Sequence, residues 1–132
     1  MIFDIYMDYL KHKIAAILYA ITYKISDFHK IMILDSDTNE IYYYTGQYNL
    51  DEKSKDFEQF ELFDFKHKNY VIGDKDTCFD YASRKSIVFY FTGYRCRGCI
   101  YGTKDFFDAT VYKHMINIHT MKKSYMFEVI VR

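Results

Sequence analysis

The sequence predicts an α+β fold, and two patterns support this class. Apolar residues recur every three or four positions near the N-terminus, which is the period of an amphipathic helix. Short runs rich in β-branched and aromatic residues follow, separated by turn-forming residues. The chain has 132 residues, of which 50% are hydrophobic, so it can build the core of one domain. We therefore expect a single domain over residues 1–132.

The N-terminal segment predicts one long amphipathic helix. Asp4, Asp8, Lys11 and Lys24 lie around its polar sides. A helix bound at a membrane surface normally carries an excess of basic residues on its polar face, and this helix does not. We expect a helix that packs on the core through a face made of Phe3, Met7, Leu10, Ile14, Ile17, Leu18, Ile21, Ile25 and Phe28.

A β-hairpin is predicted next, from two β-prone runs, Lys30–Leu34 and Glu40–Thr45. Asp35, Asp37 and Asn39 lie between the runs, and such residues favour turns because their side chains hydrogen-bond the local backbone. Their spacing also matches the first ligands of a calcium loop. That loop needs a glycine at its sixth position, where this chain has glutamate. We therefore expect a turn and no calcium site.

The remaining elements are predicted from shorter runs. Residues 51–68 are rich in charge and phenylalanine and follow no clear period, so they stay unassigned. Asn69–Ile72 and Ser86–Phe91 favour strands, the second continuous enough to be buried on both faces. Lys104–Met121 is interpreted as a second helix and Tyr125–Val131 as a closing strand. The expected fold is an N-terminal helix, a hairpin and a small antiparallel sheet with a C-terminal module.

The clearest chemical pattern lies in that C-terminal module. Cys96 and Cys99 are separated by two residues, and His114 and His119 follow after 14 intervening residues. Zinc prefers four thiolate and imidazole ligands in a tetrahedron, and this spacing is typical of such sites. The pattern predicts one structural zinc ion held by these four side chains.

Residues 94–120 resemble the two-cysteine/two-histidine zinc finger. Tyr94 lies two residues before the first cysteine, Val111 three before the first histidine, and Thr120 directly after the last. The resemblance implies a zinc-finger-like module, although 14 residues separate the ligand pairs here instead of the usual 12 or so. It covers only this stretch of the chain.

Other interpretations of the cysteines and histidines stay open. A Cys-x-x-Cys redox pair needs a helix start at the cysteines, and the expected helix begins only at Lys104. The cysteines can also be ordinary core residues, which is what we expect of Cys78. Surface or capping roles are expected for His12, His29 and His67.

Catalytic motifs are not evident in the sequence. The chain has no phosphate-binding glycine loop and no Gly-x-Ser-x-Gly nucleophile elbow. A zinc ion with four protein ligands is closed to substrate. We expect a protein that is not an enzyme and has no small-molecule substrate; a hydrolase using Cys78 with a histidine is the alternative.

Charge is distributed unevenly although the net charge is zero. Residues 1–80 contain nine Lys and fifteen Asp or Glu, a balance of −6. Residues 81–132 contain nine Lys or Arg and three acids, a balance of +6. Such asymmetry points to an anionic partner for the basic half. The alternative is that the two halves attract each other within the fold.

RNA or a ribonucleoprotein particle such as the ribosome is the expected partner. RNA recognition relies on phosphate contacts and on bases stacked against aromatic or arginine side chains. The chain offers both kinds of group in its basic half. The candidate contacts are Arg84, Lys85, Tyr94, Arg95, Arg97, Tyr101, Lys104, Thr110, Lys113, Lys122 and Lys123.

Three alternatives to RNA stay open. A DNA-binding transcription regulator is implied by the zinc-finger resemblance, which places base-reading positions at Phe107, Thr110 and Lys113. Phenylalanine cannot hydrogen-bond a base edge, and one finger reads only about three base pairs. A protein–protein adaptor braced by zinc is the second alternative. A regulatory factor of a virus or parasite is the third, because the codons of the commonest residues indicate an AT-rich genome.

The expected location is the reducing cytoplasm. Three cysteines, two of them three residues apart, do not form a disulfide framework. The apolar run Ile14–Ile21 is too short to span a bilayer, which needs about 20 residues. Asp4 and Asp8 precede it where a signal peptide carries positive charge. These features predict a soluble protein that does not enter a membrane.

Overall fold

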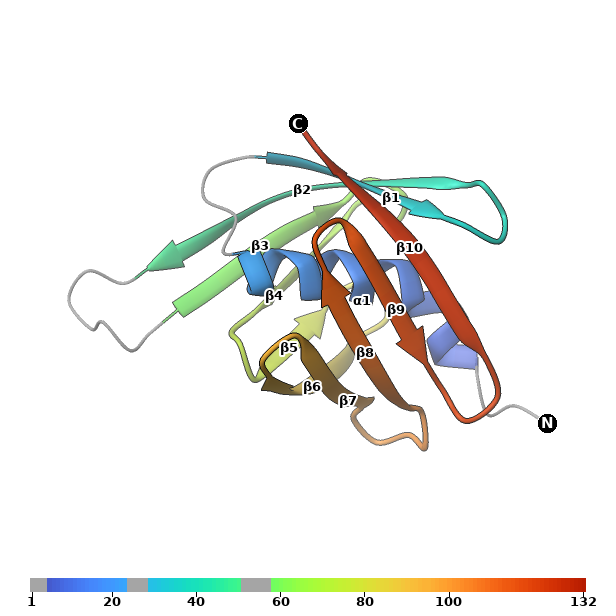
Figure 1. The fold of residues 1–132 in the computed structure, drawn as a ribbon. Helices are drawn as coiled ribbons and strands as arrows, with labels where there is room; N and C mark the ends of the chain where they lie inside the picture. The colour runs from blue at the N-terminus through green and yellow to red at the C-terminus, as the bar shows by residue number, and fades with distance from the viewer. Residues whose placement is uncertain (1–4, 24–28, 51–57) are drawn as a thin grey trace.

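The protein is described by a computed structural model that covers residues 5–23, 29–50 and 58–132. Within these ranges the chain forms one helix, α1 (Ile5–Tyr23), and the regular elements that follow it are strands (Figure 1). The strands are β1 (His29–Asp35), β2 (Ile41–Leu50), β3 (Glu58–Asp64), β4 (Asn69–Gly73), β5 (Thr77–Asp80), β6 (Lys85–Thr92), β7 (Arg95–Ile100), β8 (Phe106–Tyr112), β9 (Met115–His119) and β10 (Ser124–Val131).

The ten strands form one closed antiparallel barrel. Each strand pairs with the next along the chain, and β1 pairs with β10 to close the ring. Ile31 lies opposite Val131 and Ile33 opposite Val129 in the closing pair. An even number of strands allows closure, because only then do the first and last strands of an up-and-down barrel run antiparallel. The expected α+β fold with a small sheet is therefore wrong.

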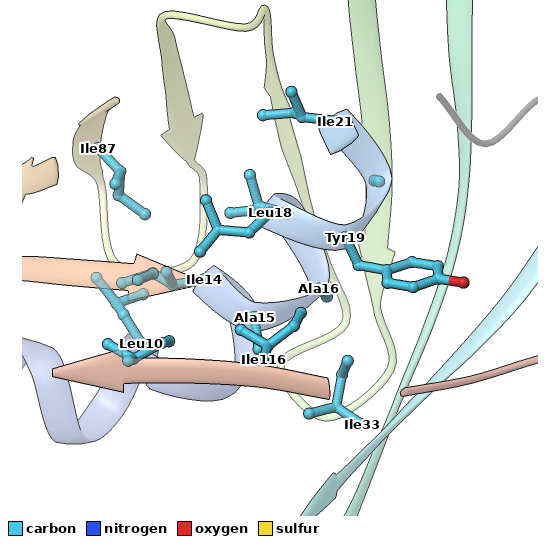
Figure 2. Close-up of a cluster of buried hydrophobic side chains, with 14 of the residues drawn as sticks. Leu10, Ile14, Ala15, Ala16, Leu18, Tyr19, Ile21, Ile33, Ile87 and Ile116 are labelled. Atoms are coloured by element: carbon cyan, nitrogen blue, oxygen red, sulfur yellow. The ribbon is translucent and has the colours of Figure 1, made fainter. Parts of the chain in front are cut away.

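The helix α1 fills the interior of the barrel (Figure 1). Eight strands enclose just enough space for side chains, so a ten-stranded ring leaves room for an additional element. Figure 2 shows Leu10, Ile14 and Leu18 of the helix among inward side chains of the barrel wall. The wall contributes Ile33, Ile87 and Ile116, among others.

Between His12 and Ile21 all sides of α1 are buried instead of one face, whereas Tyr6 and Tyr9 near its start are exposed. Ala15, Ala16 and Ala20 are buried together with the expected apolar positions from Met7 to Ile21. The sequence pattern predicted the helix correctly, but it did not predict that strands surround the helix. Phe3, Ile25 and Phe28 of the predicted apolar face lie outside the described residues.

Several predicted strands are confirmed. The hairpin corresponds to β1 and β2, with Ile31 opposite Tyr44 and Leu34 opposite Ile41. The runs at 69–72 and 125–131 correspond to β4 and β10. The run at 86–91 is β6, but only one of its faces is buried, because Val88 and Tyr90 point to solvent. The prediction of burial on both faces was wrong.

The unassigned segment 51–68 contains a strand. Its later part is β3, which pairs with β2 and β4. Phe60 and Leu62 point inward from β3 and are buried. Residues 51–57 lie outside the described residues.

The predicted helix Lys104–Met121 is wrong. This segment forms β8 and β9, joined by a tight turn in which Lys113 has a φ of 52°. Val111 and Ile116 pair across that turn and both face the core. Inward residues repeat every second position on both strands, which is the period of a strand. A helix was predicted here because the two histidines of a zinc finger lie on one, but the apolar residues of this segment do not follow a helical period.

Within the described ranges, no helix is both long enough and apolar enough to cross a bilayer.

Candidate functional site

The two cysteines of the predicted zinc site point to opposite faces of β7. Neighbouring side chains on a strand alternate, so residues three apart lie on opposite sides of the sheet. Cys96 faces the barrel core and is fully buried, whereas Cys99 is half-buried on the outer face. Burial and the charge of Asp108 raise the pKa of Cys96 to about 12. Its thiol therefore stays protonated, which disfavours metal binding.

The two histidines lie at opposite ends of β9. His114 stands in the turn before this strand, and its Nδ1 lies 3.4 Å from the hydroxyl of Tyr19 on the helix. His119 ends the strand, with its Nδ1 2.8 Å from the hydroxyl of Ser124. Five residues of extended chain separate the two histidines by about 17 Å. They cannot share one ion.

The zinc-finger interpretation is therefore wrong. Cys96, Cys99, His114 and His119 do not come together, and the expected module is part of a continuous barrel wall. In the part of the chain that the structure describes, no three histidine, cysteine or acidic side chains gather in a way that would hold a metal ion. The predicted zinc cofactor has no site among these residues.

A different constellation lies at one end of the barrel, in the turns that follow β1, β3 and β5. Alternate turns of an up-and-down barrel lie at the same end, because strand direction alternates. Each of these turns begins with a buried aspartate, namely Asp35, Asp64 and Asp80. Each carboxylate accepts a hydrogen bond from the backbone N–H two residues later, at 2.9, 3.0 and 3.3 Å respectively. The aspartates thus stabilise the turns that reverse the chain.

Lys13 of α1 connects two of these turns to the helix. Its ammonium donates to Asp80 at 2.8 Å and lies 3.0 Å from a carboxylate oxygen of Asp64. All three side chains are almost completely buried. His67 adds its Nδ1 at 2.5 Å from Asp64. Burial alone would raise the pKa of Asp64, but the hydrogen bond from His67 and the charge of Lys13 outweigh burial and lower it.

The third turn is held by the neighbouring helix residue. His12 Nε2 lies 3.0 Å from Asp35, and Lys11 lies 3.8 Å from the same carboxylate. The imidazole stacks on Tyr42, with ring centroids 3.6 Å apart. His12 is buried, so the expected surface role is wrong for it. His67 contacts the carboxylate of Asp64 in the turn between β3 and β4. The side chain of His29 lies outside the described residues.

We call Lys13, Asp64, Asp80, His12 and Asp35 the charge cluster. Each carboxylate is paired and hydrogen-bonded, and the cluster is closed to solvent, which suits a structural role. The three turns share one backbone conformation. An aspartate is followed four residues later by a residue with a φ between 52° and 61°, at Asn39, Lys68 and Arg84.

The charge cluster predicts a loss of stability as the pH falls below neutrality. Burial and the charge of Lys11 lower the pKa of His12 from 6.5, against the effect of Asp35. The unfolded state therefore takes up this proton at a higher pH than the folded state, so stability decreases below about pH 6.5, by at most about 1.4 kcal/mol per pH unit for one proton. Urea unfolding at pH 7.5, 6.5 and 5.5 measures the loss. His12→Gln should reduce this part of the pH dependence, and an unchanged profile would contradict the assignment.

The charge cluster also predicts a second decrease in folding stability, at acidic pH. The pKa values of Asp35 and Asp64 are lowered from 3.8, because favourable hydrogen bonds and positive charges outweigh their burial. Their stabilisation is complete above the unfolded pKa of about 3.9 and is lost as the pH falls through the folded values. His12→Gln should reduce the part of this acid transition that comes from Asp35, whose carboxylate pairs with His12, and should leave the part that comes from Asp64 in place.

Cys78 lies in the core, as expected of a small core residue. It is buried on β5, and burial together with the charge of Asp80 raises the pKa of its thiol. A protonated, enclosed thiol is a poor nucleophile.

The outer surface of the barrel carries the predicted RNA contacts in three places. Arg95, Arg97 and Thr110 lie on the outer face of β7 and β8. Tyr94 and Lys113 lie in turns at one end of the barrel. At the other end, in or beside the remaining turns, are Arg84, Lys85, Tyr101, Lys104, Lys122 and Lys123. The predicted contacts therefore do not form one continuous patch. The group on β7 and β8 lies between the two groups in the turns.

Strand register arranges this outer face in rows. Tyr90 of β6 lies opposite Arg97 of β7, which lies opposite Asp108 of β8. The next row places Arg95 opposite Thr110. Arg97 Nε and Arg95 Nη2 lie 3.6 and 3.9 Å from Asp108 Oδ1. These pairs are solvent-exposed and weak, so both guanidinium groups can engage a ligand.

Exposed aromatic side chains surround the arginines. Five of them on β6, β8 and the adjoining turns keep more than half of their surface in solvent: Tyr90 (71%), Tyr94 (66%), Tyr101 (71%), Phe106 (61%) and Tyr112 (63%). Sequence reasoning named Tyr94 and Tyr101 but missed the other three. The outward positions of Phe106 and Tyr112 follow from the period of two once β8 is recognised as a strand, and that of Tyr90 follows once β6 is recognised as buried on one face only.

Two hollows flank Arg97 and Asp108 on this face. The larger, of about 410 Å³, is lined by these two side chains together with Phe106, His119 and Thr120. The smaller, of about 220 Å³, is lined by the same pair with Tyr90, Thr92 and Arg95. We call this surface, with Tyr90, Arg95, Arg97, Phe106, Asp108 and His119, the aromatic–arginine face.

Comparison of the chain with protein-family models, with curated proteins and with solved structures gave no match.

Proposed function

We propose that this protein is a non-enzymatic binding protein whose aromatic–arginine face binds single-stranded RNA, free or within a ribonucleoprotein particle such as the ribosome. The observation that carries the proposal is the set of highly exposed aromatic side chains on β6, β8 and their turns. Exposed aromatic groups offer flat surfaces on which unpaired bases stack. Arg95 and Arg97, between them, suit the phosphates that connect such bases.

The charge distribution supports an anionic ligand on this side of the barrel. Strands β6 to β10 come from residues 81–132, the half with a balance of +6. The alternative was that the two halves neutralise each other. The ion pairs described above instead join residues of the same half, such as Lys13 with Asp64, or Arg97 with Asp108.

RNA is favoured over duplex DNA because of the shape of the face. The DNA-binding alternative needed a recognition helix at residues 104–121, and those residues form strands. A side chain on an open strand surface can stack with an unpaired base but cannot enter a stacked duplex without unstacking it. The three free cysteines suit the reducing cytoplasm, which is where we place this activity.

Removal of the exposed rings is expected to weaken RNA binding. Each stacked base contributes about 1–3 kcal/mol, so the double variant Tyr90→Ala/Phe106→Ala should bind a labelled single-stranded RNA at least about tenfold more weakly. Fluorescence anisotropy measures the dissociation constant. Tyr70→Ala, an exposed tyrosine on β4, is the matched control and should bind as the wild type does.

The arginines give the same experiment a second readout. Arg95→Glu/Arg97→Glu should weaken binding to every sequence, whereas Lys75→Glu in the β4–β5 turn should not. With three or more phosphate contacts, wild-type affinity should fall about tenfold or more between 50 and 200 mM salt. A protein-binding adaptor predicts a different outcome, namely a cellular partner that nuclease does not release and no measurable affinity for RNA. That result would exclude the RNA proposal.

A further inference from the structure

Asp108 is the acidic side chain at the centre of the aromatic–arginine face. It points outward from β8, and the register places it between Arg97 on β7 and His119 on β9. It lines both hollows, so any molecule that occupies either of them meets this carboxylate.

One oxygen of this carboxylate lacks a hydrogen-bond donor. Asp108 Oδ1 is shielded from solvent, and among the described residues it accepts no hydrogen bond. The two guanidinium groups approach it only to 3.6 and 3.9 Å. Buried polar atoms in folded proteins nearly always have a partner. Weak ion pairs are readily exchanged for stronger hydrogen bonds, so this carboxylate is suited to accept N–H donors from a ligand once the arginines turn to phosphate.

We propose that Asp108 selects guanine in the larger hollow, an inference that rests on the RNA-binding function proposed above. The Watson–Crick edge of guanine presents two neighbouring donors, N1–H and the N2 amino group. A carboxylate presents two neighbouring acceptors and matches this edge with two parallel hydrogen bonds. Phe106 lines the same hollow and supplies a surface for stacking the base.

The other bases fit a carboxylate less well. Adenine and cytosine each offer one amino group beside a ring nitrogen that is itself an acceptor. Uracil offers a single N–H between two carbonyl oxygens. In each case an acceptor of the base faces an acceptor of Asp108, and the two repel each other. A binding face built from rings and arginines alone would not distinguish the bases, so the carboxylate carries the selectivity.

The arginines complete the site by holding the backbone of the same nucleotide. Arg97 lines both hollows, and its side chain is largely exposed. A phosphate bound between the hollows would pair with Arg97 and Arg95 in place of Asp108. The carboxylate could then accept hydrogen bonds from the base. The smaller hollow, with Tyr90, then receives the neighbouring base without selection.

The test compares three five-nucleotide RNAs that differ only at the central base: AAGAA, AAAAA and AAIAA, where I is inosine. Inosine keeps the N1–H donor of guanine but lacks the N2 amino group. The wild type should bind AAGAA about tenfold more tightly than AAAAA, with AAIAA between them. Fluorescence anisotropy at one fixed salt concentration gives the three dissociation constants.

Asp108→Asn separates selectivity from binding. An amide presents one acceptor and one donor, which suits the donor and acceptor edge of adenine better than the two donors of guanine, so this variant should lose the preference for AAGAA or reverse it toward AAAAA, and its affinity for AAAAA should not decrease. Asp76→Asn, in the exposed β4–β5 turn, is the matched control and should keep the preference. Thermal unfolding of both variants confirms that the barrel is intact.

The outcomes distinguish this inference from the RNA proposal. If all three RNAs bind wild-type protein with equal affinity and that binding still depends on Tyr90 and Phe106, guanine selection is wrong and RNA binding stands. A guanine preference that persists in Asp108→Asn also overturns the role of the carboxylate. If none of the RNAs binds, both proposals fail together.

Discussion

Replacement of Lys13 by methionine is expected to reduce the free energy of unfolding by about 3–5 kcal/mol. The ammonium is the positive group that pairs with both Asp64 and Asp80, and both carboxylates are buried. Without it they stay in the barrel interior as uncompensated negative charges, which is the costly way to break a buried ion pair. Urea unfolding at pH 7, followed by circular dichroism, measures the loss.

Two further variants make the Lys13 experiment specific. Lys11→Met removes a partly exposed ammonium 3.8 Å from Asp35 and should cost less than about 1 kcal/mol. Lys13→Met/Asp64→Asn/Asp80→Asn removes the unpaired charges and should recover part of the loss, since amide oxygens can still accept the hydrogen bonds of the turns. The single variant should also become more stable, relative to the wild type, as the pH falls toward 4, because its carboxylates can then be protonated. A loss below about 1 kcal/mol for Lys13→Met would show that the cluster is not a structural centre.

Truncation of Leu18 to alanine should cost close to the upper part of the 2–5 kcal/mol range known for buried leucines. The cost depends on how far the surroundings can collapse into the cavity. Leu18 lies on α1 inside a ring of strands that is hydrogen-bonded all the way round (Figure 2). Such a closed wall cannot move inward at one point without disturbing its strand pairing. Chemical unfolding provides the measurement.

Ile130→Ala is the control for the Leu18 variant. Ile130 points outward from β10 and keeps about a third of its surface exposed (37%). Its truncation opens no cavity and should cost less than about 1 kcal/mol. Equal losses for the two variants would mean that the helix is not the core of the barrel.

Neither of these large effects could be anticipated from local pattern. Lys13 stands next to Ile14 in a helical repeat, and nothing in the neighbouring sequence distinguishes it from an ordinary polar position. Its partners are 51 and 67 residues away, in turns that only the order of strands brings to the helix. Of the three turn aspartates only Asp35 was identified as a turn former, and the burial of all three depends on a helix lying beneath them.

The aromatic–arginine face was predicted in part. Arg95, Arg97 and Tyr94 were expected to contact RNA because of charge and composition, which do not depend on the fold. Tyr90, Phe106 and Asp108 were missed because a helix was assigned to residues 104–121 and β6 was expected to be buried on both faces. The prediction followed the familiar spacing of two cysteines and two histidines. It disregarded the alternation of apolar residues in β8 and β9, which indicates strands. That spacing has no meaning when Cys96 and Cys99 face opposite sides of one strand.

The sequence by itself determined the local elements: the N-terminal helix, the first hairpin, the strands at 69–72, 86–91 and 125–131, and the uneven charge of its two halves. These depend on residue periods of 2 and about 3.6, on turn chemistry and on charge, all of which act over a few neighbouring residues. Only the tertiary structure decided that ten strands close into a ring, that the helix is enclosed on all sides, and that Lys13 meets Asp64 and Asp80. Closure joins β1 to β10 across almost the whole chain, and the direction in which each side chain points follows from that register.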